Sequence, residues 1–189
     1  NLYRSIKGKG NVKVTVSVSS FVPKAHTPFQ WFPQNAKEAL ERKQQLLRSL
    51  PRPKSISLQY HDARISHIEA IFSRGDRKLS ALIETAWRKG ARFDGWTEWF
   101  RYDIWMDTIR ELNIDDSFYA RRERTFDEVL PWDHLSVGVD KKYLLREWDQ
   151  AIKAEVTEDC RLNSCSACGV CPELDVQIID RRREKNGNS

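Results

Sequence analysis

Hydrophobic and polar residues alternate strictly near the beginning of the sequence. Over residues 12–19 the four valines Val12, Val14, Val16 and Val18 are separated by Lys13, Thr15, Ser17 and Ser19. Successive side chains of a β-strand point to opposite faces, so this pattern predicts a strand with one apolar and one polar face. Alternation returns over residues 54–60, through Ile56, Leu58 and Tyr60, and predicts a second strand.

An irregular loop and a helix are expected between these strands. Prolines at positions 23, 28 and 33 exclude regular structure from the aromatic segment FVPKAHTPFQWFP. Apolar residues then recur at helical spacing as far as Leu50, and Pro51 ends the helix. Asn35 has the position of the N-cap, with Glu38 as its capping-box partner. Residues 1–60 are therefore predicted to form a β/α unit.

The remaining hydrophobic pattern is mainly helical. Asp76 is the expected N-cap of a helix that ends at Gly90, a second helix spans about residues 97–112, and a third begins at Asp140. Seven tryptophans are many for such a chain, and their simplest role is to fill the core between short helices.

His61 and Asp62 follow the second predicted strand and raise the question of a catalytic base with its orienting carboxylate. Adjacent residues on a strand point in opposite directions, which favours a turn at this position instead. The run from Arg74 to Arg77 likewise predicts a turn followed by an N-capped helix.

All four cysteines of the chain lie close together near its C-terminal end. The segment DCRLNSCSACGVCP has the spacing C-x4-C-x2-C-x2-C, with Cys160, Cys165, Cys168 and Cys171 as its thiols. Thiolates this close together repel one another unless a soft cation or a cluster binds them. Gly169 allows the backbone to turn tightly around such a centre. The spacing predicts one metal or iron–sulfur site with these four ligands.

Two occupants compete for this predicted site. Zinc sites usually draw two ligand pairs from separate loops, whereas here all four ligands lie on one. The C-x2-C-x2-C run ending in Cys-Pro resembles the cluster-binding run of bacterial ferredoxins. We therefore favour a [4Fe–4S] cluster and keep zinc as the alternative.

Composition narrows the class of protein further. The 189 residues are 40% hydrophobic and 31% charged, with a net charge of +5. No apolar run is long enough to cross a bilayer, and no membrane partner is expected. The clustered cysteines favour a metal in a reducing, cytoplasmic compartment over a secreted disulfide scaffold.

Part of the positive charge lies in a basic tail at Arg181, Arg182, Arg183 and Lys185. The sequence begins at Asn1, which we interpret as a piece of a longer protein.

Several of these segments together resemble a known group of enzymes. VSVSSFVPKAHTPFQWFPQ, SHIEAIFSRGDRKLSALIETAW, GARFDGWTEWF and the cysteine loop are similar to the C-terminal part of radical SAM proteins. The similarity is to a bacterial subgroup that carries a cobalamin-binding-type N-terminal domain.

The resemblance implies an α/β fold, the end of a partial (β/α)6 radical SAM barrel followed by a mainly helical extension. It implies that residues 1–60 close the barrel, 61–155 form the extension, 156–175 hold the metal, and 176–189 form the tail. The polar face of the first strand would then border S-adenosylmethionine, with Ser17, Ser19 and Phe21 near this cofactor. The mouth of the barrel would be lined by Pro23, Lys24, His26, Thr27, Phe29, Gln30 and Trp31.

One feature of that family is missing from the sequence. The C-x3-C-x2-C motif that binds the cluster cleaving S-adenosylmethionine is absent, and the 160–171 loop has a different spacing. We therefore expect a C-terminal fragment of a radical SAM enzyme, incomplete by itself, with the loop holding an auxiliary cluster or a structural metal. Its substrate is open, as is the use of cobalamin by the whole protein. The alternative is a non-catalytic, zinc-stapled module that binds RNA or a protein partner.

Overall fold

The computed structural model describes residues 13–177. The predicted basic tail lies outside these residues apart from its first two positions, and Val12 of the first predicted strand lies outside them as well. Within the described part of the chain, none of the helices is long and apolar enough to cross a membrane.

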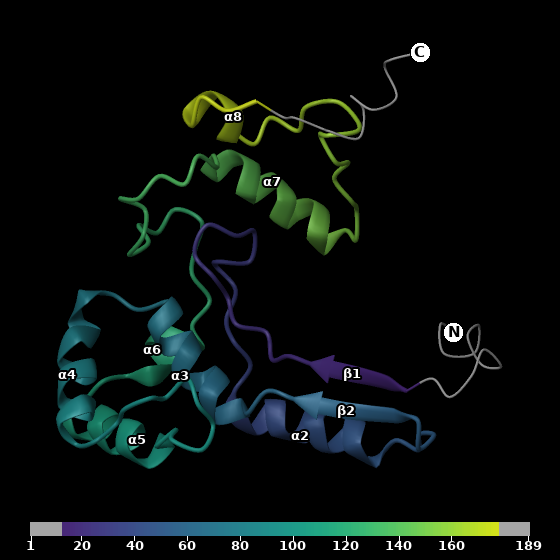
Figure 1. The fold of residues 1–189 in the computed structure, drawn as a ribbon. Coiled ribbons are helices and arrows are strands. Elements are labelled where there is room, and N and C mark those ends of the chain that lie inside the picture. Colours follow the sequence, from purple (N-terminus) through teal and green to yellow (C-terminus); the bar gives the residue numbers. More distant parts are fainter. Residues whose placement is uncertain (1–12, 178–189) are drawn as a thin grey trace. The chain divides into compact units, whose positions relative to one another are not determined.

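Two parallel strands and the helix between them form a β-α-β unit (Figure 1). The strands are β1 (Val14–Val18) and β2 (Ile56–Tyr60), paired in register from Val14 opposite Ile56 to Val18 opposite Tyr60. Helix α2 (Lys37–Ser49) connects them. The predicted strand, loop, helix and strand are thus confirmed. No further strand lies in residues 13–177, so the predicted barrel stays a prediction.

The predicted start of α2 was wrong. Ala36, and not Asn35, is the N-cap residue, and no side chain caps the helix. The capping box with Glu38 therefore does not form. Glu38 is still in the first turn, where a negative charge interacts favourably with the helix dipole.

The helices that follow β2 are shorter and more numerous than the sequence pattern predicted. In chain order they are α3 (Ala63–Ser73), the 3-10 turn η1 (Arg77–Leu79), α4 (Ser80–Arg88), α5 (Tyr102–Glu111), α6 (Asp116–Ala120), α7 (Lys141–Ile152) and α8 (Val170–Glu173). The Asp76 carboxylate accepts the backbone N–H of Lys78, so its predicted role as an N-cap is confirmed. The helix predicted from residue 97 begins only at Tyr102, because residues 94–99 form turns.

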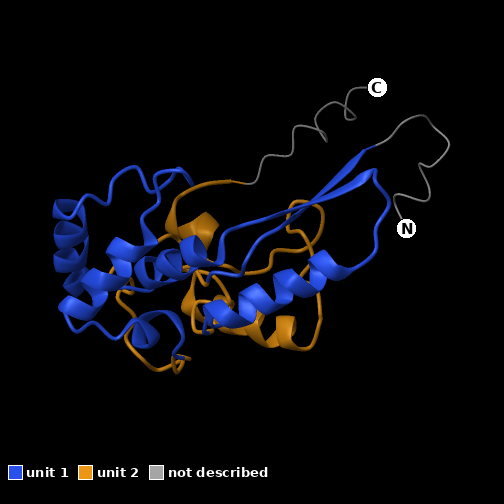
Figure 2. Ribbon diagram, turned by 90° about the horizontal axis from the view of Figure 1, so that it is seen from below, with its two compact units in different colours: residues 1–22, 33–122 blue, residues 23–32, 123–189 orange. Residues whose placement is uncertain are grey.

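The chain divides into two compact units, shown in different colours in Figure 2. The first contains residues 33–122 and the described residues up to Val22, and the second contains residues 23–32 and the chain from Glu123. This division differs from the domain boundaries expected from the sequence. The loop at 23–32 belongs with the C-terminal part, and the backbone N–H of Arg124 donates to the carbonyl oxygen of Trp31 at 2.9 Å.

Each unit has its own apolar core. In the first unit the core lies among α3, α4, α5 and α6 and contains Ile68, Ala70, Ile71, Leu79, Leu82, Ala86, Ala91, Trp105, Ile109, Tyr119 and Ala120. The smaller core of the second unit consists of Trp31, Leu130, Trp132 and Leu144. Three of the seven tryptophans are thus core residues, Trp31 and Trp132 in the second unit and Trp105 in the first. The predicted core role is wrong for Trp87, Trp96 and Trp99, which are all more than half exposed.

Candidate functional site

The cysteine loop is attached to α7 of its own unit by polar contacts. The backbone N–H of Asp140, at the N-terminus of α7, donates to the carbonyl oxygen of Cys168 at 2.9 Å. Six residues further along, the guanidinium of Arg146 donates to the carbonyl oxygen of Ser166. These contacts hold the stretch that contains the last three cysteines against a regular helix.

Two residues of the loop have left-handed backbone conformations. Ala167 has a φ of 53° and Gly169 a φ of 97°. At Gly169 the backbone is also closely packed, because an added Cβ would lie 2.9 Å from the carbonyl oxygen of Gly138 and 3.0 Å from the Asp140 side chain. Glycine is therefore required here, which confirms the predicted tight turn and leaves the bound centre a prediction.

All four cysteines are free thiols. Cys165 is exposed, while Cys160, Cys168 and Cys171 are half-buried. The backbone N–H of Ala167 points to the Cys165 sulfur, with 3.4 Å between N and Sγ. Among residues 13–177, however, no three His, Cys, Asp or Glu side chains are grouped as they would be around a metal ion. The metal site therefore stays a prediction.

The residues predicted near S-adenosylmethionine lie at the carboxyl end of β1. Ser17, Ser19 and Phe21 are all exposed. The segment just beyond them is held by Gln34, whose side-chain nitrogen donates to the carbonyl oxygen of Phe21 at 3.4 Å and to that of Ser66 at 2.8 Å. These three residues belong to the first unit, whereas the predicted mouth residues belong to the second.

Gln30 and Trp31, two of the predicted mouth residues, are core residues of the second unit. The Gln30 side-chain oxygen accepts the indole N–H of Trp132 at 2.7 Å and the backbone N–H of His26 at 3.0 Å. Trp31 is 1% exposed, and its ring packs edge-on against Phe126. In this loop, burial therefore follows from contacts with residues about a hundred positions away in the sequence.

The other predicted mouth residues are more accessible, apart from Pro23, which is buried. Thr27 fastens the turn locally, because its hydroxyl donates to the carbonyl oxygen of Lys24 at 2.8 Å. His26 has a φ of 55°, and Phe29 stacks edge-on against Phe32.

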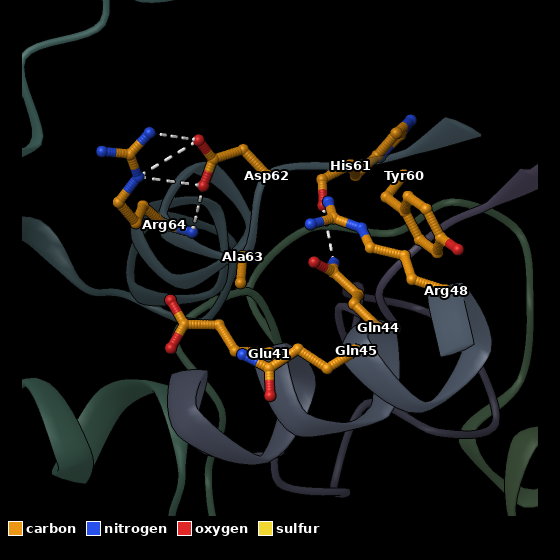
Figure 3. A pocket seen from close by; sticks show the side chains of 9 residues that line it. All are labelled: Glu41, Gln44, Gln45, Arg48, Tyr60, His61, Asp62, Ala63 and Arg64. Atoms are coloured by element: carbon orange, nitrogen blue, oxygen red, sulfur yellow. Dashed lines mark hydrogen bonds and ion pairs between the residues drawn. The ribbon is translucent and has the colours of Figure 1, made fainter. Parts of the chain in front are cut away.

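A polar cavity of about 390 Å³ lies between α2 and the carboxyl end of β2 (Figure 3). The Arg48 guanidinium lies 4.9 Å from the centroid of the Tyr60 ring, and the Gln44 side chain donates to the carbonyl oxygen of His61 at 2.9 Å. Charges of both signs line the cavity, because Glu41 and Asp62 are acidic and Arg48 and Arg64 are basic. Arg64 lies beside Asp62, with which it forms an ion pair, and Arg48 lies beside Tyr60 (Figure 3). A lining of this kind is suited to polar molecules of either charge.

Asp62 acts as the N-cap of α3 and does not orient His61. Its carboxylate accepts the backbone N–H of Arg64 at 2.8 Å and forms an ion pair with the Arg64 guanidinium at 2.6 Å. Hydrogen bonding from Arg64 holds the pKa of the Asp62 carboxyl below its usual range. In Figure 3 the His61 imidazole points away from this carboxylate. Residues 61 and 62 join β2 directly to α3, so the catalytic pair is not formed, and the predicted turn is replaced by a helix cap.

Sequence reasoning missed one group of titratable side chains. His67, Tyr102 and Asp116 lie on three different helices of the first unit and are joined by hydrogen bonds. No motif in the sequence connects them, because 34 or more positions of helix and turn separate His67 from the other two residues. His67 lies on the buried side of α3, which only the structure reveals.

Comparison with known proteins gives no match to this chain, whether with family models, with curated proteins or with solved structures.

Proposed function

We propose that the 160–171 loop binds one sulfur-ligated metal centre, and that the chain is part of a radical SAM enzyme in which this centre is auxiliary. The observation that carries the proposal is the placement of four free thiols on one loop of twelve residues. Only soft cations and iron–sulfur clusters make such a concentration of thiolates favourable.

The backbone of the loop supports this assignment. Hydrogen bonds from backbone N–H groups to ligand sulfurs are one of the means by which proteins tune iron–sulfur centres, and the Ala167 N–H already points to Cys165. The left-handed turn at Gly169 lies between Cys168 and Cys171 in the sequence. Metal binding commonly assembles ligands that are apart in the metal-free chain, so the lack of such a group among residues 13–177 does not contradict the proposal.

Cys160, Cys165, Cys168 and Cys171 would hold the centre, with a [4Fe–4S] cluster favoured over zinc. A cluster with four cysteine ligands has no open iron for substrate, so it would transfer electrons or stabilise the fold. The attachment of the loop to α7 through Asp140 and Arg146 would keep the centre fixed to a helix of its unit.

The wider enzyme assignment rests on the resemblance of the sequence, with two supporting features of the fold. Parallel strands joined by a helix are the repeating unit of α/β barrels. Such sheets place their ligands beyond the carboxyl ends of the strands, where Ser19 and Phe21 follow β1. The proposal requires that a C-x3-C-x2-C motif occurs elsewhere in the protein and supplies the cluster that cleaves S-adenosylmethionine.

Anaerobic reconstitution with iron and sulfide tests the metal centre. We expect the chain to gain broad visible absorption and about four irons per chain. The variant Cys168→Ser should lose most of this signal, whereas Ser164→Ala, in the same loop, should keep it. A chain that binds one zinc and no cluster would assign the site to zinc. Binding of neither metal would overturn the proposal.

The alternative, a non-catalytic binding module, is favoured by a separate observation. The turns between α4 and α5 expose large aromatic side chains, with Phe93 71%, Trp96 63% and Trp99 60% accessible. Beside them the Arg92 guanidinium lies 5.1 Å from the centroid of the Trp87 ring. Stacking on aromatic residues next to arginine is how many proteins bind single-stranded RNA. The alternative predicts RNA binding that weakens steeply with salt and with Trp96→Ala. Binding that is negligible at every salt concentration would exclude it.

A further inference from the structure

Three titratable side chains of the first unit meet at a cavity of about 250 Å³. His67 comes from α3, Tyr102 is the first residue of α5, and Asp116 is the first residue of α6. The Nδ1 atom of His67 lies 3.0 Å from the Tyr102 hydroxyl oxygen, and its Nε2 atom lies 2.9 Å from Oδ2 of Asp116. The remaining walls of the cavity are formed by Lys37, Glu38, Met106 and Arg121.

The protonation state of His67 follows from its surroundings. The side chain is only 8% exposed, and this burial lowers the pKa of the imidazole, an effect that Asp116 offsets only in part. A neutral imidazole has one N–H donor and one acceptor. Since an ionised carboxylate only accepts, Nε2 carries the proton and donates to Asp116. Nδ1 is then the acceptor for the Tyr102 hydroxyl.

Tyr102 connects this pair to the cavity. Burial raises the pKa of its hydroxyl, so the group stays protonated at neutral pH and donates to His67. Its oxygen retains lone pairs that can accept a hydrogen bond from a second hydroxyl group. A hydroxyl of a molecule in the cavity, bonded to Tyr102, would complete a chain of donors that leads through His67 to Asp116.

The charges around the cavity favour an anion at one wall. Lys37 forms ion pairs with Glu38 at 3.4 Å and Glu41 at 3.3 Å, so its charge is largely compensated. Arg121 is exposed, and its positive charge is near enough to lower the pKa of both His67 and Glu38. Arg121 is therefore the cation best placed to stabilise a negative charge that develops on a bound molecule.

We propose that Tyr102, His67 and Asp116 form a proton-accepting site for a small molecule with an acidic hydroxyl, a phenol or an enol. In the step, the ligand hydroxyl gives its proton to the Tyr102 oxygen as the Tyr102 proton passes to Nδ1 of His67. The products are a ligand oxyanion beside Arg121 and an imidazolium paired with Asp116. Burial of His67 opposes this transfer because it lowers the pKa of the imidazole, and the negative charges of Asp116 and of the ligand oxyanion favour it. The net charge is unchanged, and no electrons are transferred. The arrangement of hydroxyl, imidazole and carboxylate follows the logic of nucleophile, base and orienting group in enzymes.

The probe for this site is 4-nitrophenol, whose anion absorbs visible light. We expect the intact chain to bind it and to shift its apparent pKa downward, so that a bound anion is seen at a pH where the free compound is mostly protonated. Tyr102→Phe keeps the packing of the ring and removes the connecting oxygen, and it should reduce the bound-anion signal at least tenfold. Arg121→Gln should weaken it as well. Tyr119→Phe is the matched control, because the Tyr119 hydroxyl bonds Asp76 in the same unit.

Two results would overturn the proposal. One is the absence of any bound anion with the intact chain, and the other is an equal signal from Tyr102→Phe. Either would assign the three side chains to a closed structural network between helices. The absorbance of the probe is measured without added metal, so the outcome does not depend on the centre proposed for the cysteine loop.

Discussion

Replacing Gln30 by methionine separates a structural role for this residue from a role in lining an active-site mouth. Gln30 is 3% exposed, and its side-chain oxygen accepts two N–H groups, from Trp132 and from His26. Methionine has nearly the same volume and no comparable acceptor, so the substitution removes the hydrogen bonds and leaves the packing almost unchanged.

The magnitude follows from the two donors left without a partner. Each unpaired buried N–H costs about 1–3 kcal/mol, and because the His26 N–H is only partly buried we expect about 2–4 kcal/mol in total. A domain is typically stabilised by only about 5–15 kcal/mol, so this loss is a large share for the smaller of the two cores. Each 1.4 kcal/mol is a factor of about ten, so local opening should become roughly 30- to 700-fold more frequent.

Native-state hydrogen exchange measures this change within one unit, where a single unfolding curve for two units would be ambiguous. The reporter is the Arg124 N–H, which donates to the carbonyl oxygen of Trp31 and is untouched by the substitution. We expect its exchange to accelerate by the factor above in Gln30→Met. Gln45→Ala, an exposed glutamine on α2 in the other unit, should leave it unchanged. If the Arg124 N–H exchanges at the same rate in Gln30→Met as in Gln45→Ala, the structural role of Gln30 is refuted. Gln30 would then again be a candidate residue for lining a ligand site.

Three further outcomes are expected. Gly169→Ala should destabilise the cysteine loop by about 1–2 kcal/mol and weaken metal binding, because the φ of Gly169 is positive. Gly95→Ala is the control, since an added Cβ there meets nothing within 4 Å, and metal titration compares the two variants. The lowered pKa of Asp62 implies a stabilisation of less than about 1 kcal/mol that is complete above the usual aspartate pKa of about 3.9 and is lost as the pH falls through the lower pKa of the folded state. Asp62→Asn keeps a good N-cap, and its acid unfolding should lack this pH-dependent stabilisation. Arg74→Met should lower the free energy of unfolding, measured in urea, by about 2–4 kcal/mol, because the buried Arg74 guanidinium donates to two backbone carbonyls that would lose this donor. A decrease below about 0.5 kcal/mol would contradict this expectation.

Local sequence patterns were enough to locate those helices and strands whose ends are set by residues close by in the sequence. Strict alternation located β1 and β2, and the prolines around them limited α2 to the segment between two irregular stretches. Asp76 and Gly90 marked the two ends of the η1–α4 segment for the same reason, since a cap and a left-handed turn are decided within a few residues. The four-cysteine motif is equally local, because its spacing alone places the thiols on one loop.

The tertiary structure decided what long-range contacts determine. It assigned the 23–32 loop to the same unit as the C-terminal part, through Gln30 with Trp132 and Trp31 with Arg124. It also brought His67 beside residues 35 and 49 positions away. Burial and hydrogen bonding of polar side chains arise from such pairings, and hydrophobic periodicity carries no information about them. The sequence by itself therefore determined the two strands, α2, the η1–α4 segment and the spacing of the cysteine loop, while the packing of distant segments determined which polar groups share a cavity.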